Sequence, residues 1–357
     1  MKKSLIALAV LATAGVASAQ SSVTLFGIVD ATVAWGKGDT ADKIQLTNSG
    51  YNSSRLGFRG TEDLGGGMSA SFWLEAGLAN DDGQGAATSS NNQPSGTAAG
   101  AALVGRQGLT FNRRSTVSLA GGWGEVRLGR DYTPQFWNLT VFDPFGTNGV
   151  GTSLTLIGGQ ANADPVTIRA SNSIGYFLPG NLGGFYGQAQ YYMGENVSGP
   201  TEDDGSGGGV RVGFASGPFN VAGAFSRTNF LSGDFKTWNV GGQWDFGFAK
   251  LMGQYVDHRV EGPAIDLHGK GWLVGGLIPV GAGEIRLSYS TYDYGVNNAE
   301  AQKYALGYVH NLSKRTALYA TYAHLSNDGA AALSLNGSVT PAGGSSSGFD
   351  IGIRHSF

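Results

Sequence analysis

The sequence predicts an all-β protein, a transmembrane antiparallel β-barrel of about 16 strands. Three observations support this prediction. Segments that alternate apolar with polar residues recur along the chain, short and long connections alternate between them, and the last such segment runs to the final residue. Alternation indicates strands, because successive side chains of a strand point to opposite faces. A closed barrel leaves no free edge and lets every backbone group find a partner inside a membrane.

The N-terminus has the three parts of an export signal. Residues 1–3 contain two lysines, residues 5–16 are an apolar stretch, and residues 17–19 read Ala-Ser-Ala, a small-residue cleavage site. The apolar part is shorter than the roughly 20 residues that a membrane-spanning helix requires. We therefore expect residues 1–19 to be a signal peptide and residues 20–357 to form the barrel.

The composition argues against several other classes of protein. A mean hydropathy of -0.10 is too low for a bundle of membrane helices. Removing the two signal lysines leaves 23 − 2 = 21 Lys+Arg against 26 Asp+Glu, and the resulting net charge of −5 argues against nucleic-acid binding. There is no cysteine, and no nucleotide, zinc or calcium motif is convincing, so we expect no cofactor and no metal site.

The strands are expected at regular intervals from the mature start to the chain end. They run near 22–35, 54–61, 67–79, 106–120, 125–130, 165–178, 185–193, 209–216, 219–230, 236–246, 248–258, 267–278, 284–294, 302–310, 315–327 and 347–357. An even number lets both chain ends lie on the periplasmic side of an antiparallel barrel. A barrel of this size encloses an aqueous channel, whereas a barrel of about 8 strands is filled by side chains.

The lengths of the connections favour a barrel over a soluble β-sandwich, which would show the same alternation with its apolar face inward. Tight turns lie at 62–67, 121–124, 180–184, 216–218, 279–283 and 311–314. Long polar stretches lie at 36–53, 80–105, 131–164, 194–208, 295–301 and 328–346. Short turns at one end and long loops at the other are typical of bacterial outer-membrane barrels.

Several segments together resemble one known family. They are residues 22–31 (SVTLFGIVDA), 54–67 (SRLGFRGTEDLGGG), 111–113 (FNR), 128–134 (LGRDYTP), 312–316 (LSKRT) and the terminal Phe357. Over essentially its whole length the chain resembles the general-diffusion porins of Gram-negative outer membranes, most closely the trimeric branch from betaproteobacteria.

The resemblance implies a homotrimer in the outer membrane, in contact with its lipids and lipopolysaccharide. Each barrel would be a water-filled channel for passive diffusion of ions and small hydrophilic solutes. The third long loop, here about 131–164, would fold inward and constrict the lumen, anchored by Trp137, Phe142 and Phe145. Phe357 would be the signal that the barrel-assembly machinery reads.

Family porins place an arginine cluster on the wall opposite an acidic constriction loop. By matching motifs, the arginine side would hold Arg55 and Arg113. We expect three further arginines there: Arg59, which shares the parity of Arg55, Arg169, on the strand that leaves the loop, and Arg130, which lies close by. Since neighbours on a strand face opposite ways, only one of Arg113 and Arg114 should face the lumen, and we assign Arg113 to it.

The acidic side of the constriction would hold Asp131, Asp143 and Asp164. Cation-preferring relatives carry Pro-Glu-Phe-Gly-Gly in this loop, but here Pro144 stands at the glutamate position, which weakens the acidic side. Fixed charge acts most strongly on an ion where the channel is narrow. We therefore expect a weak preference for anions.

The alternatives to a general-diffusion porin are an enzymatic barrel, a substrate-specific porin or adhesin, and a soluble β-solenoid. An enzymatic barrel needs a nucleophile or activated water beside a base, yet the five histidines are scattered without a flanking motif. A substrate-specific porin would carry an aromatic track along the lumen, and an adhesin would depend on the external loops; neither has an identifiable signature. A soluble β-solenoid would need a fixed short repeat, which the alternating connection lengths contradict.

Overall fold

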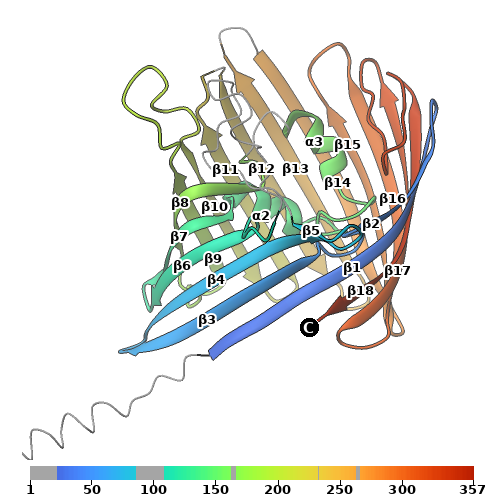
Figure 1. Ribbon diagram of the computed structural model, residues 1–357. Coiled ribbons are helices and arrows are strands. Elements are labelled where there is room, and N and C mark those ends of the chain that lie inside the picture. Colours follow the sequence, from blue (N-terminus) through green and yellow to red (C-terminus); the bar gives the residue numbers. More distant parts are fainter. Residues whose placement is uncertain (1–21, 86–107, 162–165, 232, 263–265) are drawn as a thin grey trace, which may run out of the picture.

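The structure, a computed structural model, describes residues 22–85, 108–161, 166–231, 233–262 and 266–357. The expected signal peptide lies outside the described residues. The strands form one continuous antiparallel sheet that closes on itself (Figure 1). Within the described residues, no helix is both long and apolar enough to cross a bilayer.

The sheet is built from the following strands. They are β1 (Ser22–Gly38), β2 (Lys43–Asn48), β3 (Arg55–Gly65), β4 (Met68–Ala79), β5 (Gln84–Gly85), β6 (Arg114–Gly121), β7 (Gly124–Tyr132), β8 (Arg169–Phe177), β9 (Phe185–Tyr192), β10 (Gly207–Ser216), β11 (Phe219–Thr228), β12 (Asp234–Asp245), β13 (Lys250–Glu261), β14 (Asp266–Val280), β15 (Gly283–Asp293), β16 (Glu300–Asn311), β17 (Thr316–Asp328) and β18 (Ser345–Ser356).

The prediction of 16 barrel strands is confirmed, because two of the 18 strands among the described residues are short additions to the ring. β2 pairs only with one end of β1, and β5 pairs with the last two residues of β4. The other strands are joined to their neighbours in chain order, and β1 closes the ring on β18. Figure 1 shows this closure as the blue first strand lying beside the red last strand.

The apolar face of each strand points outward, as a membrane barrel requires. In β1, Val23 and Leu25 are 67% and 54% exposed, whereas Asp30 and Thr32 on the other face are fully buried inside the ring. A soluble sandwich would bury the first pair and expose the second. The outer surface therefore suits lipid, and the inner surface is polar.

The long connection between β7 and β8 folds into the barrel. It carries two helices, α2 (Pro134–Val141) and α3 (Leu154–Ala161), and both lie inside the ring in Figure 1. The expected boundary of 131–164 begins too early, because Asp131 and Tyr132 still pair with β8. The connection runs from residue 133 to residue 168, and we call it the inner loop.

Aromatic side chains anchor the inner loop where the wall has glycine. Phe142 is fully buried, and Phe145 is 4% exposed. A Cβ on Gly241 would lie 2.3 Å from the ring of Phe142, and one on Gly307 would lie 3.1 Å from the ring of Phe145. Trp137, expected as a third anchor, is only half-buried and packs against Tyr132 within the same part of the chain.

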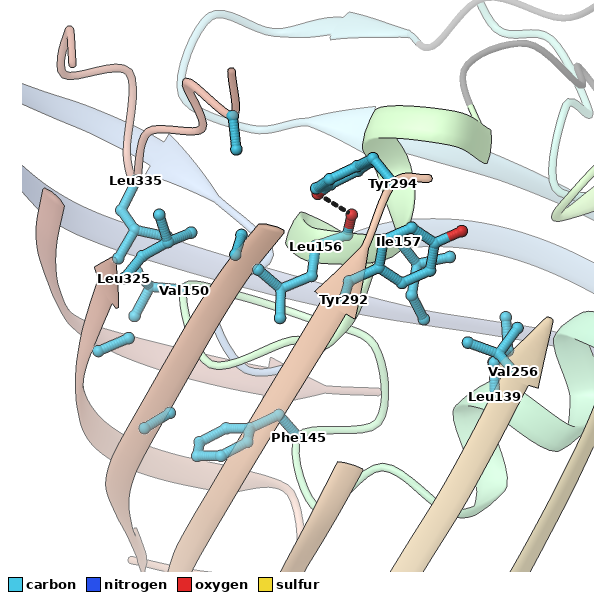
Figure 2. Packing of buried hydrophobic residues seen from close by; sticks show 14 of the residues in the cluster. Leu139, Phe145, Val150, Leu156, Ile157, Val256, Tyr292, Tyr294, Leu325 and Leu335 are labelled. Carbon is cyan, nitrogen blue, oxygen red and sulfur yellow. Dashed lines mark hydrogen bonds between the residues drawn. The ribbon is translucent and has the colours of Figure 1, made fainter. Parts of the chain in front are cut away.

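Apolar contacts continue along α3. Figure 2 shows Leu156 and Ile157 of the inner loop packed beside Tyr292 and Tyr294, and the hydroxyl of Tyr294 donates a hydrogen bond to the carbonyl of Leu156 (2.5 Å). Burial of such side chains stabilises a structure by about 1.5–3 kcal/mol each. The inner loop is thus held against the wall by a small core of its own.

Two charged side chains complete the attachment of the inner loop. Lys303 of β16, 1% exposed, donates hydrogen bonds to the carbonyls of Val150 (3.1 Å) and Thr152 and to the hydroxyl of Thr155 (3.3 Å). The backbone N–H of Val150 donates to Asp350 of β18 (2.8 Å). Hydrogen bonds to charged groups are among the stronger ones in proteins, so the tip of the loop is firmly seated.

Candidate functional site

One sector of the inner wall, formed by β3, β4, β6, β7 and β8, is rich in arginine. Arg55 and Arg59 of β3 pair with Ile28 and Thr24, which lie on the same face of β1 as the inward-pointing Asp30. Both arginines therefore point into the barrel, on the shared face that alternation predicts.

Glu75 of β4 lies at the centre of this arginine wall. Its carboxylate accepts a hydrogen bond from Arg113 Nε (2.6 Å) and another from Arg55 Nη1 (3.3 Å), and Trp73 Nε1 donates to its second oxygen (3.0 Å). Glu75 is 5% exposed, so its carboxylate binds these partners and has little contact with solvent. Glu75 was not among the expected site residues, although a carboxylate on the inward face of a strand rich in apolar residues was a usable signal.

The hydroxyl of Tyr132 joins two arginines from different strands. It accepts hydrogen bonds from Arg113 Nη2 (2.7 Å) and Arg169 Nη2 (2.9 Å). The guanidinium of Arg169 also lies 4.5 Å from the centre of the Tyr132 ring, and its Nε donates to the carbonyl of Arg113 (2.9 Å). Arg113, Arg169 and Glu75 thus form one connected polar network.

Arg130 is held by neutral groups. Its Nε donates to the carbonyl of Asn112 (2.6 Å), and its Nη1 donates to the hydroxyl of Ser171 (2.8 Å). Arg59 lies over the edge-to-face pair of Phe26 and Trp73, with its guanidinium carbon 5.3 and 5.1 Å from the two ring centres. Among the described residues, no ion pair reaches Arg59, Arg130 or Arg169.

The expectation that only one of Arg113 and Arg114 points inward is wrong. Arg113 precedes β6 and reaches Glu75, so strict strand alternation does not apply to it. Arg114 begins β6, pairs with Glu75 across the sheet, and lies 4.6 Å from the Trp73 ring centre. Both side chains therefore belong to the arginine wall.

Asp131 lies on the arginine wall and not across the lumen from it. It is a residue of β7, and its carboxylate lies 2.5 Å from Arg127 Nη1 and 3.7 Å from Arg114 Nε. Its assignment to the acidic side of the inner loop is therefore corrected. The physical reason is that β7 continues to Tyr132, so Asp131 is a strand residue on the same inward face as Arg127.

Asp143 does lie on the inner loop, but it faces the interior of the loop. Its carboxylate accepts hydrogen bonds from the backbone of Phe145 (2.8 Å) and from both the backbone (2.9 Å) and hydroxyl (2.7 Å) of Ser153. Burial raises the pKa of the Asp143 carboxyl, although the hydrogen bonds from Ser153 act in the opposite direction. The third expected acid, Asp164, lies outside the described residues.

The two sides of the lumen therefore differ sharply in charge. The arginine wall holds seven arginines (Arg55, Arg59, Arg113, Arg114, Arg127, Arg130, Arg169) and three acids (Glu75, Glu125, Asp131), a formal charge of +4. Residues 133–157 of the inner loop contain one charged residue, the buried Asp143. The half-buried loop residues that remain, such as Thr140, Thr147 and Asn148, are neutral.

Comparison with known proteins places this arrangement in context. A family model described as Gram-negative porin matches residues 4–330. The chain is 41% identical over 373 residues to outer membrane porin protein 32 of Delftia acidovorans, with 100% of both chains covered. It is similar in structure to an anion-selective porin from Comamonas acidovorans, with a TM-score of 0.81 and 37% identity over 95% of this chain and 100% of that chain. OmpT of Vibrio cholerae, solved in a trimer form, shares the fold at a TM-score of 0.64 and 15% identity, over 94% of this chain and 99% of that one.

Proposed function

This chain belongs to the Gram-negative porin family, and on that premise we propose that its channel passes anions more readily than cations. As an outer-membrane porin it forms a water-filled β-barrel through which ions and small hydrophilic solutes diffuse passively. The observation that carries the proposal of selectivity is the contrast between an arginine wall of formal charge +4 and an inner loop with no exposed carboxylate among residues 133–157.

The charge near the narrowest part of the lumen outweighs the charge of the whole chain. The sequence has a net charge of -3, but acids such as Glu202 and Asp203 lie in the connection between β9 and β10, away from the arginine wall. At physiological salt, charges more than about 8 Å from an ion are largely screened. An ion beside the inner loop therefore responds chiefly to the arginines.

Four arginines of the arginine wall have proposed roles. Arg113 and Arg169 attract the permeating anion, while Glu75 and Tyr132 fix the directions of their guanidinium groups. Arg59 and Arg130, which have no ion-pair partner among the described residues, add charge that is not offset locally. The similar protein from Comamonas acidovorans is described as an anion-selective porin, which supports this proposal.

We also propose a homotrimer whose outward apolar faces contact both neighbouring copies and the membrane. Exposed side chains such as Leu25, Phe185 and Trp244 supply those faces, and a trimer form is described for the fold relative from Vibrio cholerae. Outer-membrane lipids and lipopolysaccharide would cover the remaining surface. Residues 1–19 would be removed on export, and the barrel-assembly machinery would read Phe357.

Reversal potentials measured in planar bilayers across a KCl gradient test the selectivity. Channels of the purified protein should show a potential of the sign given by chloride permeating faster than potassium. A potential of the opposite sign would refute the proposal. Conductance steps that occur in groups of three would support the trimer, and uniformly single steps would contradict it.

A further inference from the structure

Residues 49–54, which connect β2 to β3, turn into the lumen beside the inner loop, and we name them the inner corner. We propose that the inner corner is a second constriction element, and that Tyr51 within it determines how much of the charge of Arg286 and Arg354 reaches the permeating ion. The part concerning ion preference rests on the proposed anion selectivity. The part concerning pore width does not.

Asp30 of β1 fixes the backbone of the inner corner. Its buried carboxylate accepts hydrogen bonds from the backbone N–H groups of Tyr51 (2.9 Å) and Asn52 (2.6 Å), and the hydroxyl of Tyr319 donates to its other oxygen. A carboxylate that accepts several such bonds is held in one position and holds its partners there. The inner corner is therefore attached to the wall at the strands that close the barrel.

Two glycines let the inner corner fit between the wall and the inner loop. A Cβ on Gly50 would lie 2.7 Å from the hydroxyl oxygens of Thr32 and Tyr319. A Cβ on Gly149, at the tip of the inner loop, would lie 2.0 Å from the carbonyl oxygen of Gly50, and Gly149 has a φ of 64°. A side chain at Gly50 would displace the side chains of Thr32 and Tyr319, and one at Gly149 would displace the backbone.

The inner corner also joins the two groups that shape the main constriction. The hydroxyl of Ser53 donates a hydrogen bond to the side chain of Asn148 on the inner loop (2.6 Å). The carbonyl of Ser53 accepts one from Arg55 Nε on the arginine wall (2.9 Å). The inner loop, inner corner and arginine wall are consequently continuous around part of the lumen.

Tyr51 points from the inner corner toward two arginines that the main arginine wall does not include. The guanidinium carbons of Arg286 (β15) and Arg354 (β18) lie 4.5 and 5.2 Å from the centre of its ring. Arg286 Nη2 also donates to the hydroxyl of Tyr51 (3.2 Å). Arg286 has an ion pair with Glu284 (2.9 Å), whereas Arg354 Nη1 binds only neutral oxygens, the Arg315 carbonyl and the Ser356 hydroxyl.

The ring reduces the access of anions to both guanidinium groups. A cation over an aromatic face is attracted to the electrons of the ring, and the face that the ring covers is closed to other partners. Removing the ring should both widen the lumen at the inner corner and free two positive charges. Removing the hydroxyl alone should do neither, because the ring stays in place.

The test compares Tyr51→Ala with the matched control Tyr51→Phe in planar bilayers. We expect Tyr51→Ala to raise the single-channel conductance and to raise the chloride over potassium permeability ratio by about twofold, a change that one cation–π contact at an exposed site allows. Tyr51→Phe should match the unaltered protein in both. The inference is overturned if Tyr51→Ala leaves both quantities unchanged or lowers them.

A second variant keeps the test decisive if Tyr51→Ala fails to assemble. The chain has no cysteine, so Tyr51→Cys creates a single thiol. An anionic thiol-specific reagent should then reduce the current, whereas the same reagent on Leu25→Cys, which lies on the outer face, should not. A modified Tyr51→Cys channel with unchanged current would also overturn the inference.

The proposed anion selectivity and the proposed role of the inner corner can be refuted independently of each other. The sign of the reversal potential of the unaltered protein tests the proposed function. The difference in conductance between Tyr51→Ala and Tyr51→Phe tests the inner corner, whichever ion is preferred.

Discussion

Gly27 and Phe357 exchange two backbone hydrogen bonds, each 3.1 Å from nitrogen to oxygen. A Cβ on Gly27 would lie 2.4 Å from Cζ of Phe357, so the terminal ring occupies the space that a side chain of residue 27 would need. The last residue therefore packs directly on the first strand, and the ladder between β1 and β18 continues to the end of the chain.

We predict that deleting Phe357 impairs assembly more than conduction, because its ring packs on the outward face of Gly27 at the seam between β1 and β18, whereas the side chains of the arginine wall point into the lumen. The fraction of chain that migrates as folded barrel before heating on a denaturing gel should fall, while the channels that do form should keep their conductance. Ile353→Ala, on the same outward face of β18, is the matched control and should assemble normally. Normal assembly of the deletion with an altered conductance would contradict the prediction.

We predict that Arg113→Gln and Arg169→Gln each weaken anion preference. A unit charge is worth about 1 kcal/mol to an ion about 4 Å away in water, so each change should lower the chloride over potassium permeability ratio by up to about fivefold. Reversal potentials measure this ratio. Arg227→Gln, a 53% exposed side chain on the outer face of β11, should have no effect. An equal shift in all three variants would show that the position of the charge is unimportant.

We predict that Glu75→Gln strengthens anion preference and destabilises the barrel. The substitution removes the carboxylate that faces Arg55 and Arg113, so their charge is no longer offset. Breaking a buried ion pair typically costs about 3–5 kcal/mol, which should lower the temperature at which the folded band is lost. Glu125→Gln, whose side chain is 27% exposed, should change that temperature much less. Unchanged selectivity in Glu75→Gln would argue that Arg55 and Arg113 do not contact the ion path.

We predict that Lys303→Met loosens the tip of the inner loop. The change removes the hydrogen bonds to Val150, Thr152 and Thr155, and bonds to a charged donor are worth about 1.5–3 kcal/mol each. Open-channel current noise should rise, and added protease should cut within the inner loop. Lys236→Met, on the outer face of β12, provides the comparison. If Lys303→Met channels show no increase in current noise and resist protease, the apolar contacts are sufficient to hold the inner loop in place.

The strands and the faces of their side chains could be predicted from sequence because alternation is a local property. Arg55 and Arg59 were placed on one face correctly for that reason. Arg114 was misplaced because alternation does not apply to its neighbour Arg113, which precedes β6. Asp131 was assigned to the inner loop because β7 was expected to end at residue 130, and the boundary of a strand is harder to predict than its faces.

The interior of the barrel was less predictable, because it depends on contacts between distant parts of the chain. Neither α2 nor α3 was foreseen, since each is short and is held by packing against the wall more than by its own sequence. Glu75 was missed, although its partner Arg113 was identified. Most of the inner corner was expected within the long polar stretch 36–53, and its hydrogen bonds to Asp30 and Asn148 show that it turns inward.

Asp30 and Asp350 hold the inner corner and the inner loop, and they lie on the first and last strands of the ring. Because the pairing of β1 with β18 closes the ring, the attachments on these two strands come together only when the barrel is closed. We expect a barrel in which β1 and β18 have not paired to lack a complete constriction. Such a barrel should let through solutes that are too large for the closed channel. Permeability to oversized solutes would then report defects in biogenesis, independently of any change in the residues that line the pore.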